Sequence, residues 1–353
     1  MKAYVHGGDV YRHPDVLDFS ANINPLGTPW GVIRAARESM DRIACYPDAA
    51  KEKLREKLAC DQGVRPEWLI FGNGAAELIF SLVWAVRPRK ALVLAPTFAE
   101  YEQALRGAGC QVEYCTLTAS EGFLAGEKLL DRIRKTEPQL VFLCNPNNPT
   151  GLLAEPSLLR RLAGLCREKN ILLAVDECFM DFVPRPEEHT LKPLLDSVPG
   201  LFLLKAFTKT YAMAGLRLGY GICSDPGLLE AMENRMQPWN VSIPAQEAGL
   251  AALEEGDYVK EARRLVFRES VWLKEQLKAL GYSVYDSQAN YIFFRGEETL
   301  GECLLKKQIM VRDCSNYRGL EKGYYRIAVR TRRENEALLA AVRKAREEWQ
   351  KQS

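Results

Sequence analysis

Short apolar runs alternate with stretches of helical periodicity from about residue 60 to residue 235. The runs are almost continuously apolar, which is typical of strands that are buried on both faces of a sheet. Strands that alternate with helices predict an α/β fold with a mostly parallel sheet of seven strands. The candidate strands are WLIFG (68–72), ALVLA (91–95), QVEYCTL (111–117), QLVFLCN (139–145), ILLAVDE (171–177), LFLLKAF (201–207) and LRLGYGIC (216–223).

After residue 240 the pattern changes. A long helical segment, DYVKEARRLVFRESVWLKEQLKAL, precedes the short runs YSVYDS, NYIFFR, IMVRDC and YYRIAVR, which together predict a smaller α+β domain. The first twenty-odd residues are rich in Gly, Pro and Asn, so we expect them to fold back over the site or onto the small domain. The predicted division is a large domain over residues 28–237 and a small domain that combines residues 1–27 with residues 238–353.

Composition narrows the class of protein. The 48 basic and 46 acidic residues nearly cancel, so no overall field points to nucleic acid. The opening MKAYVHGGDVYRHPD contains no apolar signal region, and no apolar run is long enough to cross a bilayer, so we expect a cytoplasmic protein. The ten cysteines are scattered without a CxxC pair, and only three histidines occur. This composition favours reduced thiols over a disulfide framework and argues against a metal site.

The segment KAFTKTYAMAGLRLGYG carries the first candidate site residues. Lys209 directly follows a strand that is predicted to be buried, where an ammonium group needs a partner or a chemical use. Arg217 lies eight residues later in an apolar setting, and its planar guanidinium matches the geometry of a phosphate. Either residue alone would be read as a charge at the edge of the sheet that pairs with a carboxylate. Their spacing together favours a site.

Two further motifs follow predicted strands. Asp176, in AVDECF, closes a buried strand, and a carboxylate there needs a cationic partner such as the pyridinium nitrogen of pyridoxal phosphate. The plain alternative for Asp176 is a cap on the next helix. Asn148, in CNPNNPTG, lies in a turn that proline makes rigid, so its amide has a fixed direction. By itself, the NPTG sequence would indicate only a turn.

The segment FGNGAAELIF passes from a strand through glycines into a helix. Such a turn predicts that the backbone N–H groups of Asn73, Gly74 and Ala75 face an anion at the helix N-terminus. The motif also resembles half of a dinucleotide fingerprint. Glu77 replaces the third glycine of that fingerprint, so the evidence for a nicotinamide oxidoreductase is weak.

The motifs GNG, PTF, NPTG, VDE, and FTK followed by GLRLGY resemble those of the fold-type-I pyridoxal-phosphate enzymes, in particular the group around histidinol-phosphate aminotransferase. The resemblance runs nearly from end to end of the chain. It implies that Lys209 carries pyridoxal phosphate as a Schiff base and that Asp176 pairs with the ring nitrogen. Both would act in catalysis. It also implies that Asn148 bonds the ring hydroxyl.

The same resemblance assigns the remaining cofactor contacts. Phe98, in APTFAEY, is implied to stack on the ring, and Arg217 is implied to hold the cofactor phosphate together with the Asn73–Gly74 turn and Ala75. Tyr46, in CYPD, would reach the cofactor of a neighbouring subunit, which implies a homodimer.

Two positions depart from the aminotransferase pattern. Ala206 stands where Ser or Thr is common, so one hydroxyl contact to the phosphate is missing, and Thr208 is a candidate to replace it. Phe179 stands where the aminotransferases have a tyrosine that bonds the ring hydroxyl.

The segments VHGGD, DFSANINPLG and RMQPWNVS are similar to the L-threonine O-3-phosphate decarboxylases of cobalamin biosynthesis, which also have Phe at the position of Phe179 and FAEY at residues 98–101. From the residues alone, His6 and Gly7 would indicate a flexible tail, and Arg312 and Arg326 would indicate charges at strand ends that form surface ion pairs. The resemblance assigns the substrate contacts instead to His6, Gly7, Asn22, Asn148, Arg312 and Arg326.

The implied reaction is decarboxylation of L-threonine O-3-phosphate to (R)-1-aminopropan-2-yl phosphate. A substrate phosphate bound by Arg312, Arg326 and His6 would fix which bond at Cα is broken, and Lys209 would supply the proton that replaces CO₂. One methyl group does not separate threonine phosphate from serine phosphate at this stage. The alternatives are histidinol-phosphate transamination and, from a different class, a non-catalytic protein that senses a ligand.

Overall fold

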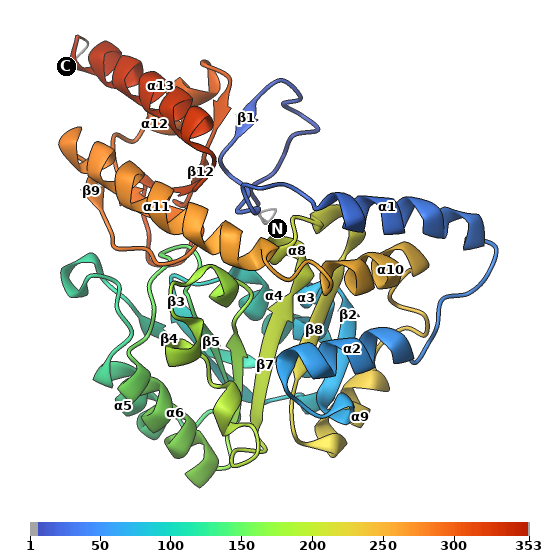
Figure 1. Cartoon of the computed structure of the whole chain (residues 1–353). Helices are drawn as coiled ribbons and strands as arrows, with labels where there is room; N and C mark the ends of the chain where they lie inside the picture. The colour runs from blue at the N-terminus through green and yellow to red at the C-terminus, as the bar shows by residue number, and fades with distance from the viewer. Residues whose placement is uncertain (1–5, 352–353) are drawn as a thin grey trace.

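A seven-stranded sheet forms the centre of the larger part of the molecule (Figure 1). The computed structural model describes residues 6–351 and gives the strand order β2-β8-β7-β6-β5-β3-β4. Strand β8 runs antiparallel to both of its neighbours, and the other neighbouring strands are parallel. The strands are β2 (Leu69–Asn73), β3 (Lys90–Ala95), β4 (Gln111–Thr116), β5 (Leu140–Cys144), β6 (Leu172–Asp176), β7 (Leu201–Ala206) and β8 (Leu218–Ile222). The predicted α/β fold with a mostly parallel seven-stranded sheet is therefore confirmed.

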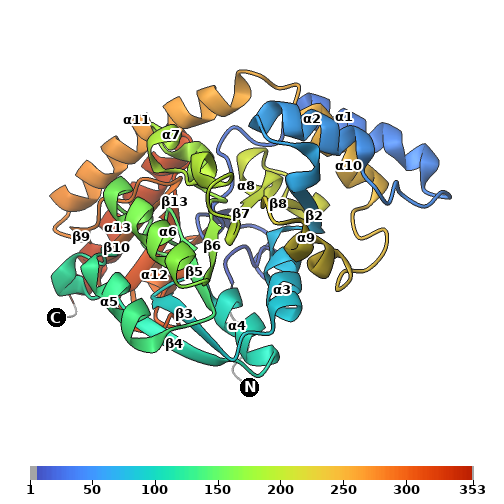
Figure 2. The ribbon, with the colours of Figure 1, turned by 90° about the horizontal axis from the view of Figure 1, so that it is seen from below.

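Alternate residues of the strands belong to two cores, one on each face of the sheet. In β7, Leu201 and Leu203 belong to one core, and Phe202 and Leu204 belong to the other. Helices α2, α5, α6 and α10 contribute to the first core, and α3, α4 and α9 contribute to the second (Figure 2). Their bounds are α2 (Glu52–Gln62), α3 (Ala75–Val86), α4 (Ala99–Gly107), α5 (Glu127–Thr136), α6 (Pro156–Glu168), α9 (Pro226–Glu233) and α10 (Ile243–Ala252). Burial on both faces explains the continuous apolar runs.

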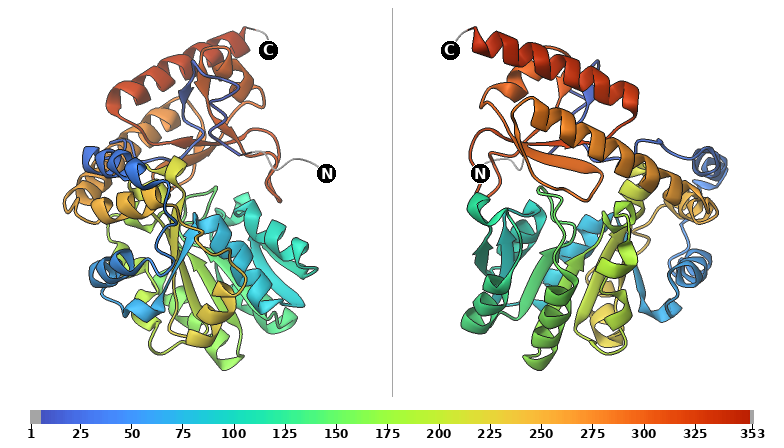
Figure 3. Two further views of the ribbon diagram at one scale, coloured as in Figure 1. Left: turned by 90° about the vertical axis from the view of Figure 1, so that its right-hand side faces the viewer. Right: turned by 60° about the vertical axis from the view of Figure 1, so that its left-hand side comes forward.

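A smaller sheet with the order β12-β13-β10-β9 lies beyond one end of the large sheet and packs with the C-terminal helices (Figures 1 and 3). The N-terminal segment joins this part, because β1 pairs in parallel with β11 and Phe19 is buried in its core. The elements are β1 (Leu17–Asp18), α11 (Tyr258–Ala279), β9 (Ser283–Val284), β10 (Tyr291–Arg295), α12 (Leu300–Leu305), β11 (Ile309–Met310), β12 (Arg312–Asp313), β13 (Tyr324–Ala328) and α13 (Arg332–Gln350).

Helix α10 follows residue 237, yet it packs on α1 (Trp30–Glu38), on α2 and on β8. The short helices α7 (Pro186–His189) and α8 (Phe207–Thr210) follow β6 and β7, respectively. The domain boundaries given above stay a prediction.

The described residues contain no helix that has both the length and the apolar character needed to span a membrane. All ten cysteines lie within residues 6–351, and none of them forms a disulfide. Cys144 and Cys178 are buried, which agrees with their apolar sequence context.

We expect Leu203→Ala, in the centre of β7, to lower the free energy of unfolding by about 2–5 kcal/mol, because this fully buried side chain would leave a cavity that the sheet and its helices cannot close. Leu124→Ala is the control, since Leu124 is 53% exposed, and its cost should stay below about 0.5 kcal/mol. Guanidinium unfolding curves measure both changes. Equal effects of the two substitutions would contradict this account of the core.

Candidate active site

A cavity of about 240 Å³ lies where the carboxyl ends of the central strands meet the small sheet. Ligands of α/β sheets commonly bind at this edge. Residues singled out from the sequence that line the cavity are His6, Gly7, Asn22, Ala75, Phe98, Asn148, Asp176, Phe179, Ala206, Thr208, Lys209, Arg217, Arg312 and Arg326. The structure thus brings together residues that are far apart in the sequence, although their individual roles stay predictions.

Lys209 lies in α8, directly after β7, and its side chain reaches the cavity. Burial, together with the nearby cations Arg326 and Arg217, lowers the pKa of its amine to about 8. A lysine with a lowered pKa has a larger fraction of neutral amine at physiological pH. That neutral amine is the form that attacks a carbonyl carbon.

Asp176 is the last residue of β6, and both of its carboxylate oxygens are held by protein donors. The Tyr101 hydroxyl donates to Oδ2 at 2.5 Å, and the backbone N–H of Cys178 donates to Oδ1 at 2.9 Å. Tyr101 is fully buried in α4 and was not singled out from the sequence. It follows Phe98 by about one helical turn, which is the only signal that places it near the site.

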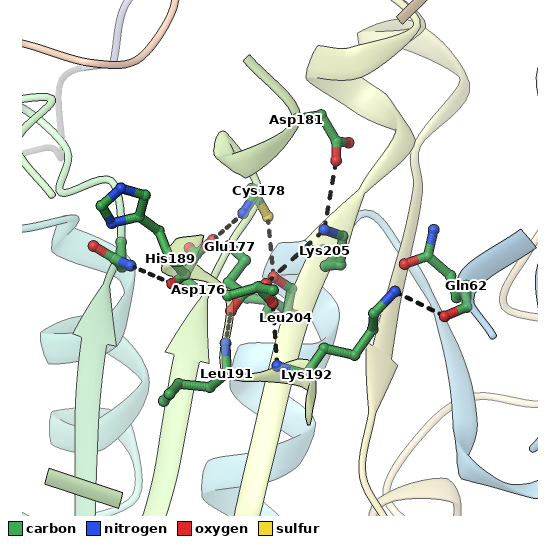
Figure 4. A network of polar contacts seen from close by, with 12 residues as sticks. Gln62, Asp176, Glu177, Cys178, Asp181, His189, Leu191, Lys192, Leu204 and Lys205 are labelled. Carbon is green, nitrogen blue, oxygen red and sulfur yellow. Dashed lines mark hydrogen bonds and ion pairs between the residues drawn. The ribbon is translucent and has the colours of Figure 1, made fainter. Parts of the chain in front are cut away.

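A buried polar network supports the turn after Asp176 (Figure 4). Glu177 accepts hydrogen bonds from the Thr190 hydroxyl at 2.7 Å and from the Leu191 backbone N–H at 2.9 Å. The amine of Lys205 lies 3.5 Å from Asp181 and 4.0 Å from Glu177, so the buried ammonium group has two carboxylate partners. Because every member of this group has a partner, it fixes the turn that carries Asp176 instead of adding a reactive group.

Two arginines of the small sheet lie directly opposite each other, because Arg312 in β12 is the cross-strand partner of Arg326 in β13. Like charges in that relation destabilise a sheet unless an anion or polar groups compensate them. Arg326 donates from Nη1 to Asn148 Oδ1 and from Nη2 to the Ser20 carbonyl oxygen at 2.8 Å. Arg312 donates to Asn316 Oδ1 at 2.8 Å and to the Asp313 carbonyl oxygen.

The turn before α3 differs from the sequence prediction in its hydrogen bonds. The N–H of Asn73 donates to Glu77 Oε2 at 2.6 Å, and the N–H of Gly74 donates to the Gly72 carbonyl oxygen at 2.8 Å. These two N–H groups are therefore used inside the protein, and neither residue lines the cavity. Ala75 and Ala76, in the first turn of α3, do line it. The predicted anion site is therefore restricted to the first turn of α3.

Gly74 leaves room for the side chain of Arg217. A Cβ atom at this position would lie 2.4 Å from Nη2 of Arg217, and its φ of +77° is one that side chains rarely adopt. Glycine therefore lets the Arg217 guanidinium lie against the N-terminus of α3, where backbone N–H groups and the helix dipole favour an anion.

Three buried polar atoms on cavity-lining residues have no hydrogen-bond partner among residues 6–351: Asn22 Oδ1, Glu100 Oε2 and Arg326 Nε. An unsatisfied buried polar group costs about 1–3 kcal/mol, so three around one cavity indicate a polar ligand. The lining residues that were not singled out from the sequence are Ser20, Ala21, Ala76, Glu100, Cys144, Cys178 and Tyr317.

Tyr46 lies outside the cavity of its own chain. Its side chain is 77% exposed, and its ring stacks on Trp239 with 4.4 Å between centroids. The predicted contact of Tyr46 with the cofactor of a second subunit stays a prediction.

The chain matches the family described as Aminotransferase class I and II over residues 14–342. The threonine-phosphate decarboxylase of Salmonella typhimurium is 39% identical over 350 residues, which cover 96% of this chain and 95% of that protein. An adenosylcobalamin biosynthesis bifunctional protein of Leptospira interrogans is 30% identical over 93% of this chain and 38% of its own length. The crystal structure of the histidinol-phosphate aminotransferase from Clostridium acetobutylicum is 28% identical with a TM-score of 0.88, and covers 94% of this chain and all of that one.

We expect Tyr101→Phe to lower the free energy of unfolding by about 1.5–3 kcal/mol, because it removes a hydrogen bond to a buried carboxylate without changing the shape of the ring. Tyr114→Phe is the control, since its hydroxyl accepts an exposed hydrogen bond from Arg106 at 3.4 Å, and its cost should stay below about 0.5 kcal/mol. Guanidinium unfolding of both variants measures the difference. A Tyr101→Phe variant as stable as the control would show that this hydroxyl does not hold Asp176.

Proposed function

The chain belongs to the aminotransferase class I and II family, and from that premise we propose that it decarboxylates L-threonine O-3-phosphate to (R)-1-aminopropan-2-yl phosphate, with pyridoxal phosphate as its cofactor. The observation that carries the proposal is the 39% identity to the threonine-phosphate decarboxylase of Salmonella typhimurium over almost all of both chains. The likeness to the Leptospira interrogans protein supports a role in cobalamin biosynthesis.

The residues of the cavity fit pyridoxal phosphate. The Lys209 amine, with its lowered pKa, would bond the cofactor's aldehyde carbon, and Asp176 would pair with the ring nitrogen. Arg217 and the first turn of α3 would hold the cofactor phosphate, because Gly74 leaves room for the guanidinium there. Phe98, the N-cap residue of α4, lines the cavity and would stack on the ring.

The side chain of Asn148 is oriented for one kind of partner. Its Oδ1 accepts hydrogen bonds from Arg326 and, at 3.3 Å, from the Tyr317 hydroxyl. Its Nδ2 is then the group that can donate to the ring hydroxyl oxygen. Because Arg326 would also bind the substrate phosphate, it would link substrate binding to the orientation of the Asn148 amide that holds the ring. Thr208 also lines the cavity and is proposed to contact the cofactor phosphate in place of the hydroxyl that Ala206 lacks.

When bound, pyridoxal phosphate supplies a protonated ring that withdraws electrons from the bond broken at Cα. The substrate's phosphate would be bound by Arg312, Arg326 and His6, with Gly7 and Asn22 beside them. Binding at the phosphate, away from the reacting atoms, holds the substrate carboxylate in one orientation. Loss of CO₂ leaves an electron pair at Cα, and Lys209 would deliver the proton that this carbon gains.

We propose that the enzyme is a homodimer in which Tyr46 reaches the second site. Tyr46 belongs to an exposed apolar surface that monomers rarely carry without a partner. Other exposed apolar side chains in the flanking segments are Trp30, Met40, Ile43 and Trp239.

Transamination of histidinol phosphate is the second candidate, and the likeness to the Clostridium acetobutylicum structure favours it. Phe179 argues against it, because phenylalanine cannot make the hydroxyl contact of the aminotransferase tyrosine. A ligand sensor without catalysis is disfavoured, because such a protein has no use for both Lys209 and Asp176 in one cavity.

We expect the purified protein to be yellow and to release CO₂ from L-threonine O-3-phosphate without forming a matching amount of keto acid. Free L-threonine, which lacks the phosphate, should be a poor substrate. Lys209→Ala should lose the visible absorbance of the lysine-bound cofactor while the protein stays folded. Keto acid in place of CO₂ would support the aminotransferase, and a colourless protein after incubation with pyridoxal phosphate would contradict the cofactor assignment.

We expect Arg326→Gln to lower the rate of CO₂ release at least about tenfold and to raise the fraction of keto acid, because the loosened phosphate lets the substrate adopt a second orientation. Arg295→Gln is the control from the same small sheet, since its exposed side chain pairs with Glu321 and lies outside the cavity. CO₂ and keto acid are measured in the same reaction. A higher KM with unchanged turnover and product ratio would mean that Arg326 supplies only uniform binding.

A further inference from the structure

The carboxyl group of Glu100 lies in the cavity and has no role in the chemistry described so far. It belongs to the first turn of α4, between Phe98 and Tyr101, and its side chain is only 13% exposed. Its Oε2 is buried without a hydrogen-bond partner among the described residues, and its Oε1 lies 3.3 Å from Nε2 of His6. Glu100 therefore touches the N-terminal segment with one oxygen and leaves the other unsatisfied.

Ionisable groups from five segments face Glu100. They are His6 of the N-terminal segment, Asp176 at the end of β6, Lys209 of α8, Arg312 of β12 and Tyr317 of the loop after β12. Burial, helped by Asp176, raises the pKa of Glu100 to about 7, although the backbone N–H of Glu100, Arg312 and Lys209 act in the opposite direction. Burial, together with Arg312 and Arg326, lowers the pKa of His6. At pH 8 Glu100 is therefore mostly ionised and His6 is neutral.

The proposed substrate brings a phosphate and a carboxylate into this cavity. An ionised Glu100 would repel both of these anionic groups at short range, and the repulsion is strong because the effective dielectric constant of a buried cavity is low. Its Oε1, 3.3 Å from Nε2 of His6, also competes with the substrate phosphate, which would need the same imidazole nitrogen as a donor. Protonation of Glu100 removes the repulsion and weakens the attraction between its Oε1 and the imidazole.

We propose that Glu100 is a positioning residue that takes up one proton when the phosphorylated substrate binds and thereby releases His6 to the substrate phosphate. This inference rests on the proposed function for the identity of the ligand. It assigns no chemical step to Glu100, whose effect on the substrate acts through His6 and through the charge of the cavity.

Sulfate tests the inference, because it is a tetrahedral dianion that neither reacts nor titrates near neutral pH. Calorimetry of sulfate binding to the holoenzyme at pH 8, in two buffers of different ionisation enthalpy, gives the number of protons taken up. We expect about one proton for the unmutated protein and almost none for Glu100→Gln. Glu102→Gln, on the same helix but paired with Arg106 and Arg318 outside the cavity, should behave like the unmutated protein.

The affinity provides a second readout that a purely structural role would not change. Above pH 7 the sulfate Kd of the unmutated protein should rise by about tenfold per pH unit, because one proton must be bound with each anion. The Kd of Glu100→Gln should change little over the same range, and the two proteins should converge at pH 6.

His6→Gln separates the two members of the contact. Proton uptake that persists in His6→Gln and is lost in Glu100→Gln supports the proposal. Uptake that persists in Glu100→Gln, or is lost only in His6→Gln, overturns it, as does a failure of sulfate to bind. Release of CO₂ from L-threonine O-3-phosphate is followed in a separate assay, so that a failure of the proposed function is distinguished from a failure of this inference.

Discussion

The side chain of Arg326 joins three segments that the chain order keeps far apart. It extends from β13 of the small sheet, donates to Asn148 after β5, and donates to the carbonyl oxygen of Ser20 in the N-terminal segment. Hydrogen bonds from a buried guanidinium are stronger than neutral ones, and breaking one leaves a charge unpaired. Arg326 thereby links the small sheet and the N-terminal segment to the turn after β5, at the carboxyl end of the large sheet.

The arrangement of the two sheets gives the cavity more positive than negative side chains. Arg312 and Arg326 face each other across β12 and β13, and Lys209 and Arg217 add two more cations to the same cavity. Asp176 and Glu100 are the carboxylates that line it, so cations outnumber anions there. The cofactor and the substrate each carry a phosphate, and these two phosphates supply the negative charge that the cavity lacks. Burial lowers the pKa of Lys209, and the positive charges of Arg326 and Arg217 add to that effect.

The seven strands could be predicted from the sequence because burial on both faces leaves a strong local signal, and their ends differ by at most two residues from the prediction. Lys209, Asp176 and Arg217 could be predicted because their charge conflicts with an apolar setting. Tyr101 and Glu100 carry no such signal, since each lies in an ordinary amphipathic helix and acts on a residue that only the tertiary fold brings close. The N–H groups of Asn73 and Gly74 were assigned to an anion because a sequence does not reveal that internal acceptors already bind them.

The residues proposed to hold the cofactor ring and those proposed to orient the substrate come from different parts of the molecule. Asp176, Lys209 and Arg217 follow or flank strands of the large sheet, and packed helices and the Glu177–Lys205 network make that frame rigid. His6, Arg312 and Arg326 come from the N-terminal segment and the small sheet, which contact the frame through polar groups such as Arg326 and through apolar side chains such as Phe293 and Tyr324. Under the proposed assignment, changes in the second set would alter how a substrate is oriented and would leave the contacts to the ring in place. One scaffold can therefore serve aminotransferases and decarboxylases alike, and in this chain Phe179, which packs edge-on against Tyr291, removes the hydroxyl that the aminotransferase pattern adds to the frame.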